Sequence, residues 1–256
     1  MVNALYKTFC SLYSFLVGKI EEIFLKKKIF SNNNKINSLN SYGFQKLKIK
    51  KKLAIDSALF NEINVNNYFK RLIIKKDDIV LLIKNLFVEN ELSNKITDIT
   101  GYKYSVGFFL CYKTLHVPKS EENKSIYANH WHQDKPYSSN TLKIILPIQQ
   151  ITEEEGPMEI LPKEIKFRDL KKNEIKSKIY KAKMDSDEIL IFNPNKCLHR
   201  AGIPSEGKAR TQIMLQLNVS SKWTYNSDIA YRQNFREPKF PLFSYFAVKR
   251  DNIENI

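Results

Sequence analysis

Glycine, cysteine and long apolar runs are all scarce in this chain of 256 residues. Only 7 glycines are present, and none of them belongs to a loop of the kind that cradles phosphate groups. The three cysteines, Cys10, Cys111 and Cys197, are odd in number and lack paired spacing, so the sequence indicates neither a disulfide framework nor a zinc knuckle. We therefore expect a reducing, cytoplasmic environment, with Cys197 as a small buried residue rather than a metal ligand.

The composition is that of a folded protein with a basic surface. Hydrophobic residues make up 43% of the chain and charged residues 27%, which is not the profile of a disordered segment. The formal net charge is +15, so the surface will attract anions, although the codon bias of an AT-rich genome would account for the lysines equally well. The lysine runs lack the interleaved aromatic residues of a single-strand-binding platform, so no specific nucleic-acid partner is expected.

The N-terminal segment, residues 1–30, has the pattern of an amphipathic helix. Its uncharged stretch between Lys7 and Lys19 has only 11 residues, too short to span a bilayer. Two placements remain open: the apolar face packs on the rest of the protein, or residues 1–28 lie in an anionic membrane interface. The apolar residues that recur at helical spacing are Leu5, Phe9, Leu12, Phe15 or Leu16, Ile20 and Ile23.

A basic polar segment, residues 31–55, reads as a linker, and residues 56–256 read as one domain. We expect a helical scaffold over 56–100, with helices over 66–76 and 77–90. From 101 onwards, short β-rich runs alternate with turn clusters, which favours a sandwich or barrel. The predicted fold is mainly β with flanking helices, and its strands are expected over 102–117, 126–134, 141–151, 158–161, 188–192 and 211–219.

Three of the four histidines fall where a predicted strand runs into a turn. On an extended strand His132 and Asp134 point to one face and can hold one ion together. His199 follows a second strand and supplies a third ligand. Two histidines and one carboxylate leave coordination positions open and suit iron(II). His130 competes with His132 for the first position, but only His132 has an aspartate two residues later.

Arg210 is the candidate anchor for a dicarboxylic acid. Residues 203–208 read as the turn of a hairpin that places position 199 opposite position 210. Arg210 would then stand on the strand beside His199 and aim its guanidinium at the metal pocket. A guanidinium binds a carboxylate through two parallel hydrogen bonds.

Five separated blocks of the chain resemble the phytanoyl-CoA dioxygenase family. The blocks are HQD (132–134), LKIIL (142–146), EGPMEILP (155–162), DEILIF (187–192) and LHRAG (198–202), followed by Arg210. The resemblance covers roughly residues 101–220. It departs after Pro162, where Lys163 and Glu164 replace the usual glycine, serine and histidine, so the substrate does not carry over.

The resemblance implies a double-stranded β-helix core, or jelly roll, that uses iron(II), 2-oxoglutarate and dioxygen. It maps the metal ligands onto His132, Asp134 and His199 and the 2-oxoglutarate anchor onto Arg210. Candidates for further 2-oxoglutarate contacts are Tyr112, Lys143 and Gln212.

The reaction that the resemblance implies is hydroxylation of a small molecule, since Asp134 leaves no coordination position for chloride. The basic charge points to an anionic, lipid-linked or glycan-linked substrate. Two rivals remain. One is a non-catalytic basic β-barrel that binds nucleic acid or a membrane surface, and the other is a cupin-like metal enzyme without 2-oxoglutarate.

Overall fold

The computed structural model describes residues 2–26, 38–50, 60–233, 236–237 and 250–255. Its helices are α1 (Val2–Phe24), α2 (Ser38–Tyr42), α3 (Lys76–Lys84), α4 (Leu92–Thr100) and α5 (Asp228–Arg232), with a π-helical turn η2 (Asn85–Glu89) and 3-10 turns η3 (Phe167–Lys171), η4 (Asn173–Lys178) and η5 (Ile253–Asn255). Its strands are β1 (Phe44–Lys48), β2 (Asn61–Asn66), β3 (Phe69–Ile73), β4 (Lys103–Leu115), β5 (Leu142–Pro147), β6 (Glu159–Ile160), β7 (Tyr180–Lys181), β8 (Glu188–Phe192), β9 (His199–Arg200), β10 (Ala209–Ser220), β11 (Thr224–Asn226) and β12 (Arg250–Asn252).

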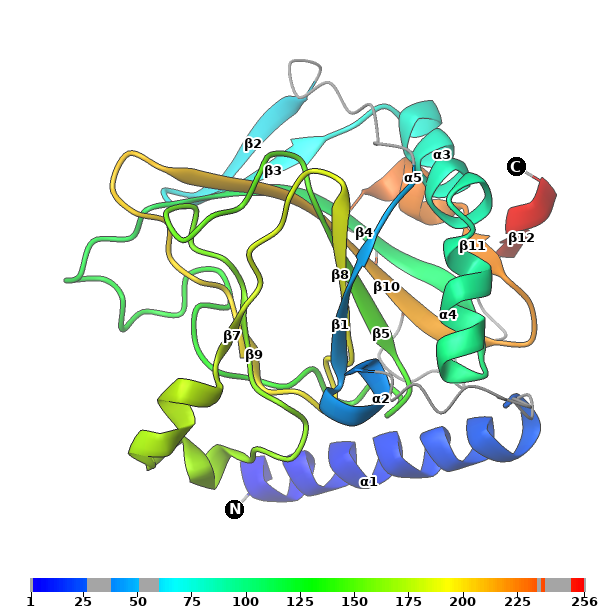
Figure 1. The fold of residues 1–256 in the computed structure, drawn as a ribbon, viewed down its shortest axis with the longest axis horizontal. Helices are drawn as coiled ribbons and strands as arrows, with labels where there is room; N and C mark the ends of the chain where they lie inside the picture. The colour runs from blue at the N-terminus through cyan, green and yellow to red at the C-terminus, as the bar shows by residue number, and fades with distance from the viewer. Residues whose placement is uncertain (1, 27–37, 51–59, 234–235, 238–249, 256) are drawn as a thin grey trace.

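The strands form two sheets, and the chain contributes strands first to one sheet and then to the other (Figure 1). The large sheet has the order β1-β8-β5-β10-β4-β11-β12, and the small sheet has the order β7-β6-β9. A single bridge from His132 to His199 extends the small sheet by one position. From β4 to β10 the chain crosses repeatedly between the sheets, which is the winding of a double-stranded β-helix. The predicted fold class is confirmed.

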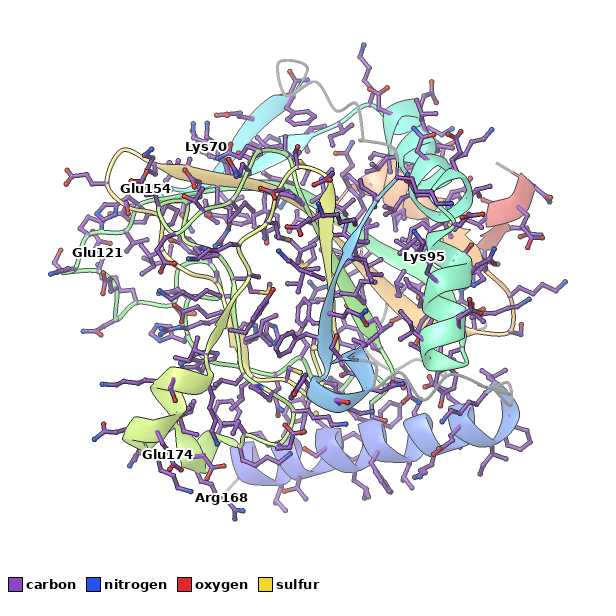
Figure 2. The ribbon with its side chains drawn as sticks, in the orientation of Figure 1. Lys70, Lys95, Glu121, Glu154, Arg168 and Glu174 are labelled. Atoms are coloured by element: carbon purple, nitrogen blue, oxygen red, sulfur yellow. The ribbon has the colours of Figure 1, made fainter. Side chains whose placement is uncertain are left out.

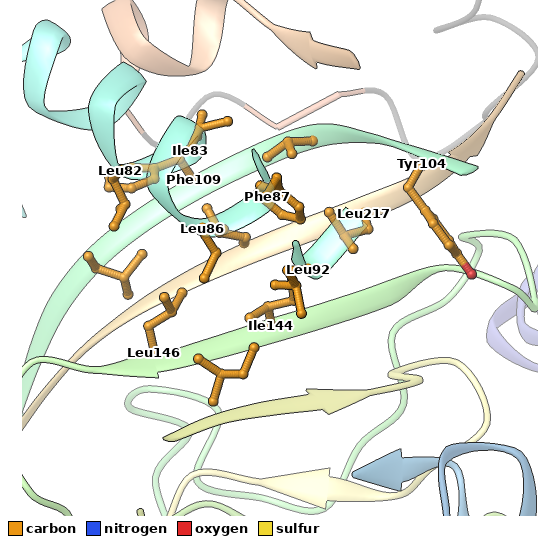
Figure 3. Packing of buried hydrophobic residues seen from close by; sticks show 14 of the residues in the cluster. Leu82, Ile83, Leu86, Phe87, Leu92, Tyr104, Phe109, Ile144, Leu146 and Leu217 are labelled. Carbon is orange, nitrogen blue, oxygen red and sulfur yellow. The ribbon is translucent and has the colours of Figure 1, made fainter. Parts of the chain in front are cut away.

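Helices cover one face of the large sheet. Side chains at alternate positions of β4, β5 and β10 point to this face, because successive residues of a strand point in opposite directions. They meet the apolar faces of α3, η2 and α4, as Figure 3 shows for Leu82, Phe87, Phe109, Ile144 and Leu217. The helix predicted over 77–90 corresponds to α3 and η2, with Asp77 and Asp78 in its first turn.

The opposite face of the large sheet looks toward the small sheet. Ile145, Leu190 and Phe192 of the large sheet form one buried cluster with Ile160 and Cys197 from the side of the small sheet. Polar side chains of the same face, including Lys143 and Arg210, lie between the two sheets and are also buried. The space between the sheets is therefore apolar at one end and polar where the candidate site lies.

Two segments differ from the sequence predictions. The helix predicted over 66–76 is wrong: β2 and β3 form a hairpin, and β3 extends the large sheet by pairing Phe69–Leu72 with β4. Backbone groups along the edge of β4 satisfy those of β3, which outweighs helix propensity. The described part of the expected linker, residues 38–50, instead forms α2 and β1, and β1 pairs with β8. The division of the chain into domains stays a prediction.

Helix α1 docks on the barrel through its small and polar residues. Its docked face consists of Cys10, Ser14, Val17, Gly18 and Glu21, all buried. The Ser14 carbonyl accepts a hydrogen bond from the backbone of Ser139 (3.1 Å), and Asn140 Nδ2 donates to the Gly18 carbonyl (3.0 Å). A Cβ at Gly18 would lie 1.9 Å from Ser139 Oγ, so a larger residue here would require the Ser139 side chain to move. Within the described ranges, no helix is both long and apolar enough to cross a bilayer.

Glu21 at this interface gives the docking a predicted pH dependence. Burial raises the pKa of Glu21 to about 7, although hydrogen bonds from Ser138 and Asn140 and the charge of Lys196 oppose the rise. The folded chain then keeps this proton up to about pH 7, whereas the unfolded chain releases it near the ordinary pKa of 4.5. Folding stability is therefore lost as the pH rises from about 4.5 through 7. The full loss is on the order of 3 kcal/mol.

We expect Glu21→Gln to be more stable than the original chain at pH 8 by up to about 3 kcal/mol and nearly equal to it at pH 4. Urea unfolding at the two pH values measures the difference. The control is Glu22→Gln, because the neighbouring Glu22 is exposed and ion-paired with Lys19. Equal stability of Glu21→Gln and the original chain at both pH values would contradict the prediction.

Candidate metal centre

Three side chains from segments far apart in the sequence meet between the two sheets. His132 and Asp134 lie in the long connection between β4 and β5, and His199 begins β9. One ligand atom from each of these residues lies within 4.8 Å of the other two, and no other cluster of this kind occurs in the described part of the chain. Nε2 of His132 is 3.7 Å from Oδ1 of Asp134, and the two imidazole rings are 4.3 Å apart. The arrangement fits a single metal ion.

The backbone structure that positions these residues differs from the predicted one. The strand expected over 126–134 is wrong, since only His132 forms a bridge there. Its backbone N–H and carbonyl each form a 3.0 Å hydrogen bond with His199. The backbone N–H of Asp134 donates to the Pro194 carbonyl (2.8 Å). The two ligand segments are therefore joined directly to each other, and not through a regular strand.

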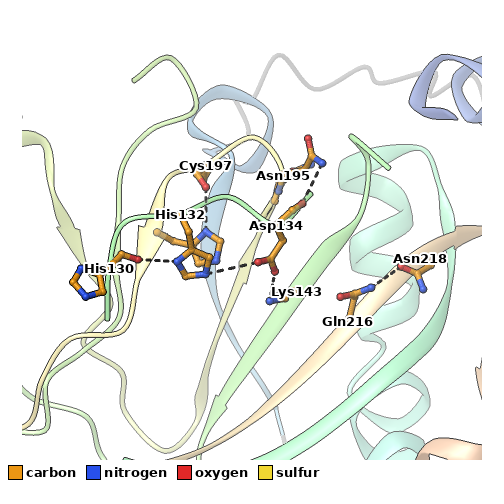
Figure 4. A network of polar contacts seen from close by, with 10 residues as sticks. His130, His132, Asp134, Lys143, Asn195, Cys197, Gln216 and Asn218 are labelled. Carbon is orange, nitrogen blue, oxygen red and sulfur yellow. Dashed lines mark hydrogen bonds and ion pairs between the residues drawn. The ribbon is translucent and has the colours of Figure 1, made fainter. Parts of the chain in front are cut away.

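Hydrogen bonds orient both imidazole rings for metal binding. Nδ1 of His132 is 2.8 Å from the His130 carbonyl, and Nδ1 of His199 is 3.1 Å from the Cys197 carbonyl (Figure 4). A carbonyl only accepts, so each Nδ1 carries the proton and each Nε2 keeps a lone pair. Burial lowers the pKa of His199 to about 3, and Asp134 opposes this only in part, so His199 is neutral at pH 7. A divalent metal requires a lone pair at Nε2 of each ring, and this orientation of the rings provides one.

The Asp134 carboxylate is charged and has one oxygen available for a metal. Burial by itself would raise the pKa of Asp134, but the charge and hydrogen bond of Lys143, together with the two histidines, outweigh burial and hold the pKa below its ordinary value. Lys143, a buried residue on β5, forms an ion pair with Oδ2. Oδ1 faces His132. The sequence singled out Lys143 as a 2-oxoglutarate contact, whereas the structure places it on the carboxylate as a partner that fixes its orientation.

Arg210 lies between the sheets, but not in the predicted register. Position 210 pairs with Thr114 of β4, and β9 pairs with β6, so the hairpin that would set Arg210 beside His199 is wrong. The segment between β9 and β10 crosses from the small sheet to the large one. Arg210 nevertheless projects from the face of β10 that carries Gln212 and Met214, toward the small sheet.

The guanidinium of Arg210 is fully buried and only partly satisfied. Its Nη1 donates to the carbonyls of Gly156 and of Gly202, the latter at 3.2 Å. A Cβ at Gly202 would lie 2.3 Å from the Pro157 carbonyl, so glycine lets the two loops close over Arg210. Nε and Nη2 find no acceptor in the described part of the chain. Buried N–H groups without acceptors are costly, so they mark a place for an anion.

A cavity of about 360 Å³ adjoins the cluster. It is lined by His132, Asp134, His199 and Lys143 on its polar side and, among others, by Phe69, Leu110, Tyr112, Ile126, Tyr127, Met158, Phe192 and Met214. Tyr112 and Tyr127 also neighbour the Arg210 guanidinium. Gln212 donates a hydrogen bond from Nε2 to Tyr112. Of the predicted secondary contacts, Tyr112 thus connects Arg210 with the cavity, and Gln212 bonds to Tyr112.

The rival ligand His130 lies outside the cluster. Its side chain is exposed, and Figure 4 shows its ring turned away from Asp134. Its backbone carbonyl is the group that orients His132.

No protein-family model matches this chain, and no curated protein matches it. Among solved structures it is similar to EctD from S. alaskensis with bound Fe, at 12% identity and a TM-score of 0.49 over 76% of this chain and 80% of that one. It is also similar to SnoN, a non-heme alpha ketoglutarate dependent epimerase from nogalamycin biosynthesis, at 11% identity and 0.48 over 70% and 78%. A third is HygX from Streptomyces hygroscopicus with nickel and 2-oxoglutarate bound, at 9% identity and 0.47 over 72% and 86%. The functional conclusion rests on the side chains of this chain.

Proposed function

We propose that this protein is an iron(II)- and 2-oxoglutarate-dependent oxygenase of the phytanoyl-CoA dioxygenase type that hydroxylates a small molecule. The observation that carries the proposal is the meeting of His132, Asp134 and His199 within 4.8 Å at a cavity that Tyr112 and Tyr127 also line. These two tyrosines neighbour the buried Arg210, which has two unsatisfied N–H groups. Two imidazoles and one carboxylate are the ligand set of non-haem iron(II) oxygenases.

The residues fit the metal in charge and in orientation. Both histidines present a lone pair at Nε2, because each Nδ1 bonds to a backbone carbonyl. The two oxygens of Asp134 have different partners: Oδ2 forms an ion pair with Lys143, and Oδ1 faces His132. Iron(II) bound there would supply activation of dioxygen and oxidation of a C–H bond of the substrate. Lys143 would keep Asp134 charged and fixed while the metal is held.

The anion site fits 2-oxoglutarate. Nε and Nη2 of Arg210 offer the distal carboxylate two charge-assisted hydrogen bonds in a site that excludes water. The third nitrogen, Nη1, donates hydrogen bonds to the carbonyls of Gly156 and Gly202, so the guanidinium is oriented before the anion binds. Tyr112 lies between Arg210 and the cavity and would contact the bound cosubstrate.

The cavity wall favours a substrate with an apolar part. Phe69, Leu110 and Ile126 are among its apolar lining residues, and Arg236 adds a positive charge. An anionic or lipid-linked small molecule matches this combination, and the strongly basic surface would attract it.

An anaerobic titration tests the proposal directly. Adding iron(II) and then 2-oxoglutarate should produce the weak visible charge-transfer band of the chelated metal, at one equivalent of each. His130→Ala should keep the band, because that side chain is exposed. A chain that binds iron(II) but never shows the band with 2-oxoglutarate would indicate a metal enzyme of another kind. A chain that binds no metal would favour a non-catalytic barrel.

A further inference from the structure

Helix α1 presents its apolar side outward. The apolar face of α1, defined here as Leu5, Phe9, Leu12, Leu16, Ile20 and Ile23, is the stripe that the sequence would place against a core. These side chains are between 47% and 73% exposed, and Phe24 beyond them is 77% exposed. The docked face lies on the other side of the helix and contains Ser14, Gly18 and Glu21. Of the two placements that the sequence left open, packing of the apolar face on the rest of the protein is therefore not the one that the structure shows.

The outward apolar side of α1 indicates what kind of surface the helix contacts. A surface helix of a globular protein normally buries its apolar stripe and exposes its polar one. Here three buried polar or small positions hold the helix through specific hydrogen bonds, among them Asn195 Nδ2 to Ser14 Oγ at 3.2 Å. The helix lies along one edge of the molecule, with its outer side facing away from both sheets (Figure 1). A contiguous apolar strip of this size marks an interaction surface.

Positive charge lies along one flank of the apolar face. A cavity of about 320 Å³ lies between α1 and the barrel, and its charged lining consists of four lysines against one glutamate. These are Lys19, Lys26, Lys163 and Lys196, with Glu22. Phe15, exposed beside the apolar face, also lines this cavity, so the basic cavity opens at the flank of the stripe. Burial and the neighbouring Lys163 lower the pKa of Lys196, and Glu22, which pairs with Lys19 and Lys26, opposes this only in part.

The turns η3 and η4 extend the same side of the molecule. Lys135 donates a hydrogen bond to Ser11 of α1. Burial and then the charge of Lys166, which precedes η3, lower the pKa of Lys135, so this segment lies close to α1. Arg168 projects to the side on which α1 lies (Figure 2). Phe167 is 52% exposed. The exposed basic residues of this segment are Lys166, Arg168, Lys171, Lys172, Lys176 and Lys178.

We propose that the apolar face of α1, with the basic cavity beside it, binds the surface of an anionic lipid bilayer. The apolar side chains enter the boundary between headgroups and acyl chains, parallel to the membrane plane. The lysines of the cavity meet the phosphate headgroups, and the net charge of +15 draws the protein to the surface. A second copy of the chain would cover the apolar face equally well, but it would bring a second set of the same lysines against the first.

Vesicle sedimentation with the full chain tests the proposal. The probes are vesicles of phosphatidylcholine alone and of phosphatidylcholine with added phosphatidylglycerol. The full chain should sediment with the anionic vesicles, and added salt should release it. Leu12→Ser/Leu16→Ser/Ile20→Ser should bind at least about tenfold more weakly. Lys163→Ala/Lys196→Ala should lose roughly 5-fold for each lysine on anionic vesicles only.

The matched control is Ile63→Ser/Leu81→Ser, which changes side chains 49% and 53% exposed elsewhere on the surface and should bind as the original chain does. All these positions except the half-buried Lys163 are exposed, and thermal unfolding checks that each variant keeps its fold. Absence of binding by the full chain would overturn the proposal, and so would unchanged binding by the α1 triple variant. A full chain that is dimeric and ignores vesicles, beside a monomeric triple variant, would show self-association and overturn it as well.

Discussion

Alanine at His132 or His199 is expected to abolish iron-dependent turnover of 2-oxoglutarate. Each imidazole would donate one of three protein ligands through Nε2, and its Nδ1 is already committed to a backbone carbonyl. Loss of an outer partner of a metal ligand typically costs roughly 10- to 100-fold in affinity, and loss of a ligand should cost more. Iron(II) affinity measured anaerobically, together with turnover of 2-oxoglutarate, gives the comparison.

The third ligand calls for a different substitution. Asp134→Ala would leave Lys143 as a buried charge without a partner and would destabilise the fold for that reason alone. Asp134→Asn keeps the shape of the side chain and removes its charge, so it reports on the metal more directly. His130→Ala is the control for all three. A fully inactive His130→Ala beside an active His132→Ala would show that the ligands are wrongly assigned.

Arg210→Ala is expected to weaken binding of 2-oxoglutarate strongly and to leave the affinity for iron(II) alone nearly unchanged. Removing one partner of a buried charged pair costs about 2 to 5 kcal/mol, which corresponds to roughly 30-fold to several thousand-fold in affinity. Lysine would keep the charge but lose the forked geometry, so Arg210→Lys should fall between the two. Anaerobic isothermal titration of the three proteins measures the series.

Arg210 also supports two loops through Gly156 and Gly202, so its removal has a structural effect that needs its own control. Unchanged iron(II) affinity of Arg210→Ala shows that the barrel has kept its fold. Lys208→Ala changes an exposed cation two residues away that pairs with Glu154, and it should bind 2-oxoglutarate normally. Equal 2-oxoglutarate affinity in Arg210→Ala and the original chain would refute the cosubstrate assignment, even with all three metal ligands correct.

The two-residue spacing of His132 and Asp134 and the distant His199 were readable from the sequence, and the structure brings all three together. The strands β4, β5, β8 and β10 were readable as well, because each falls in a β-rich run bounded by turn residues. Residue type and spacing suffice where the chemistry is local or the hydrophobic pattern is strong. The jelly-roll fold class followed from that pattern together with the family resemblance.

Tertiary structure alone decided the features that depend on partners distant in sequence. The segment 66–76 became a hairpin because the free edge of β4 needed hydrogen-bond partners, and Arg210 reached the site by a crossing between sheets rather than by pairing with β9. The ion pair of Lys143 with Asp134 depends on the register of β5, which the sequence does not display. The orientation of α1 is the clearest case. Hydrophobic periodicity defines two faces of a helix, but the side chains of the barrel decide which face packs on the protein. Here Ser138, Asn140 and Asn195 form hydrogen bonds with the polar face.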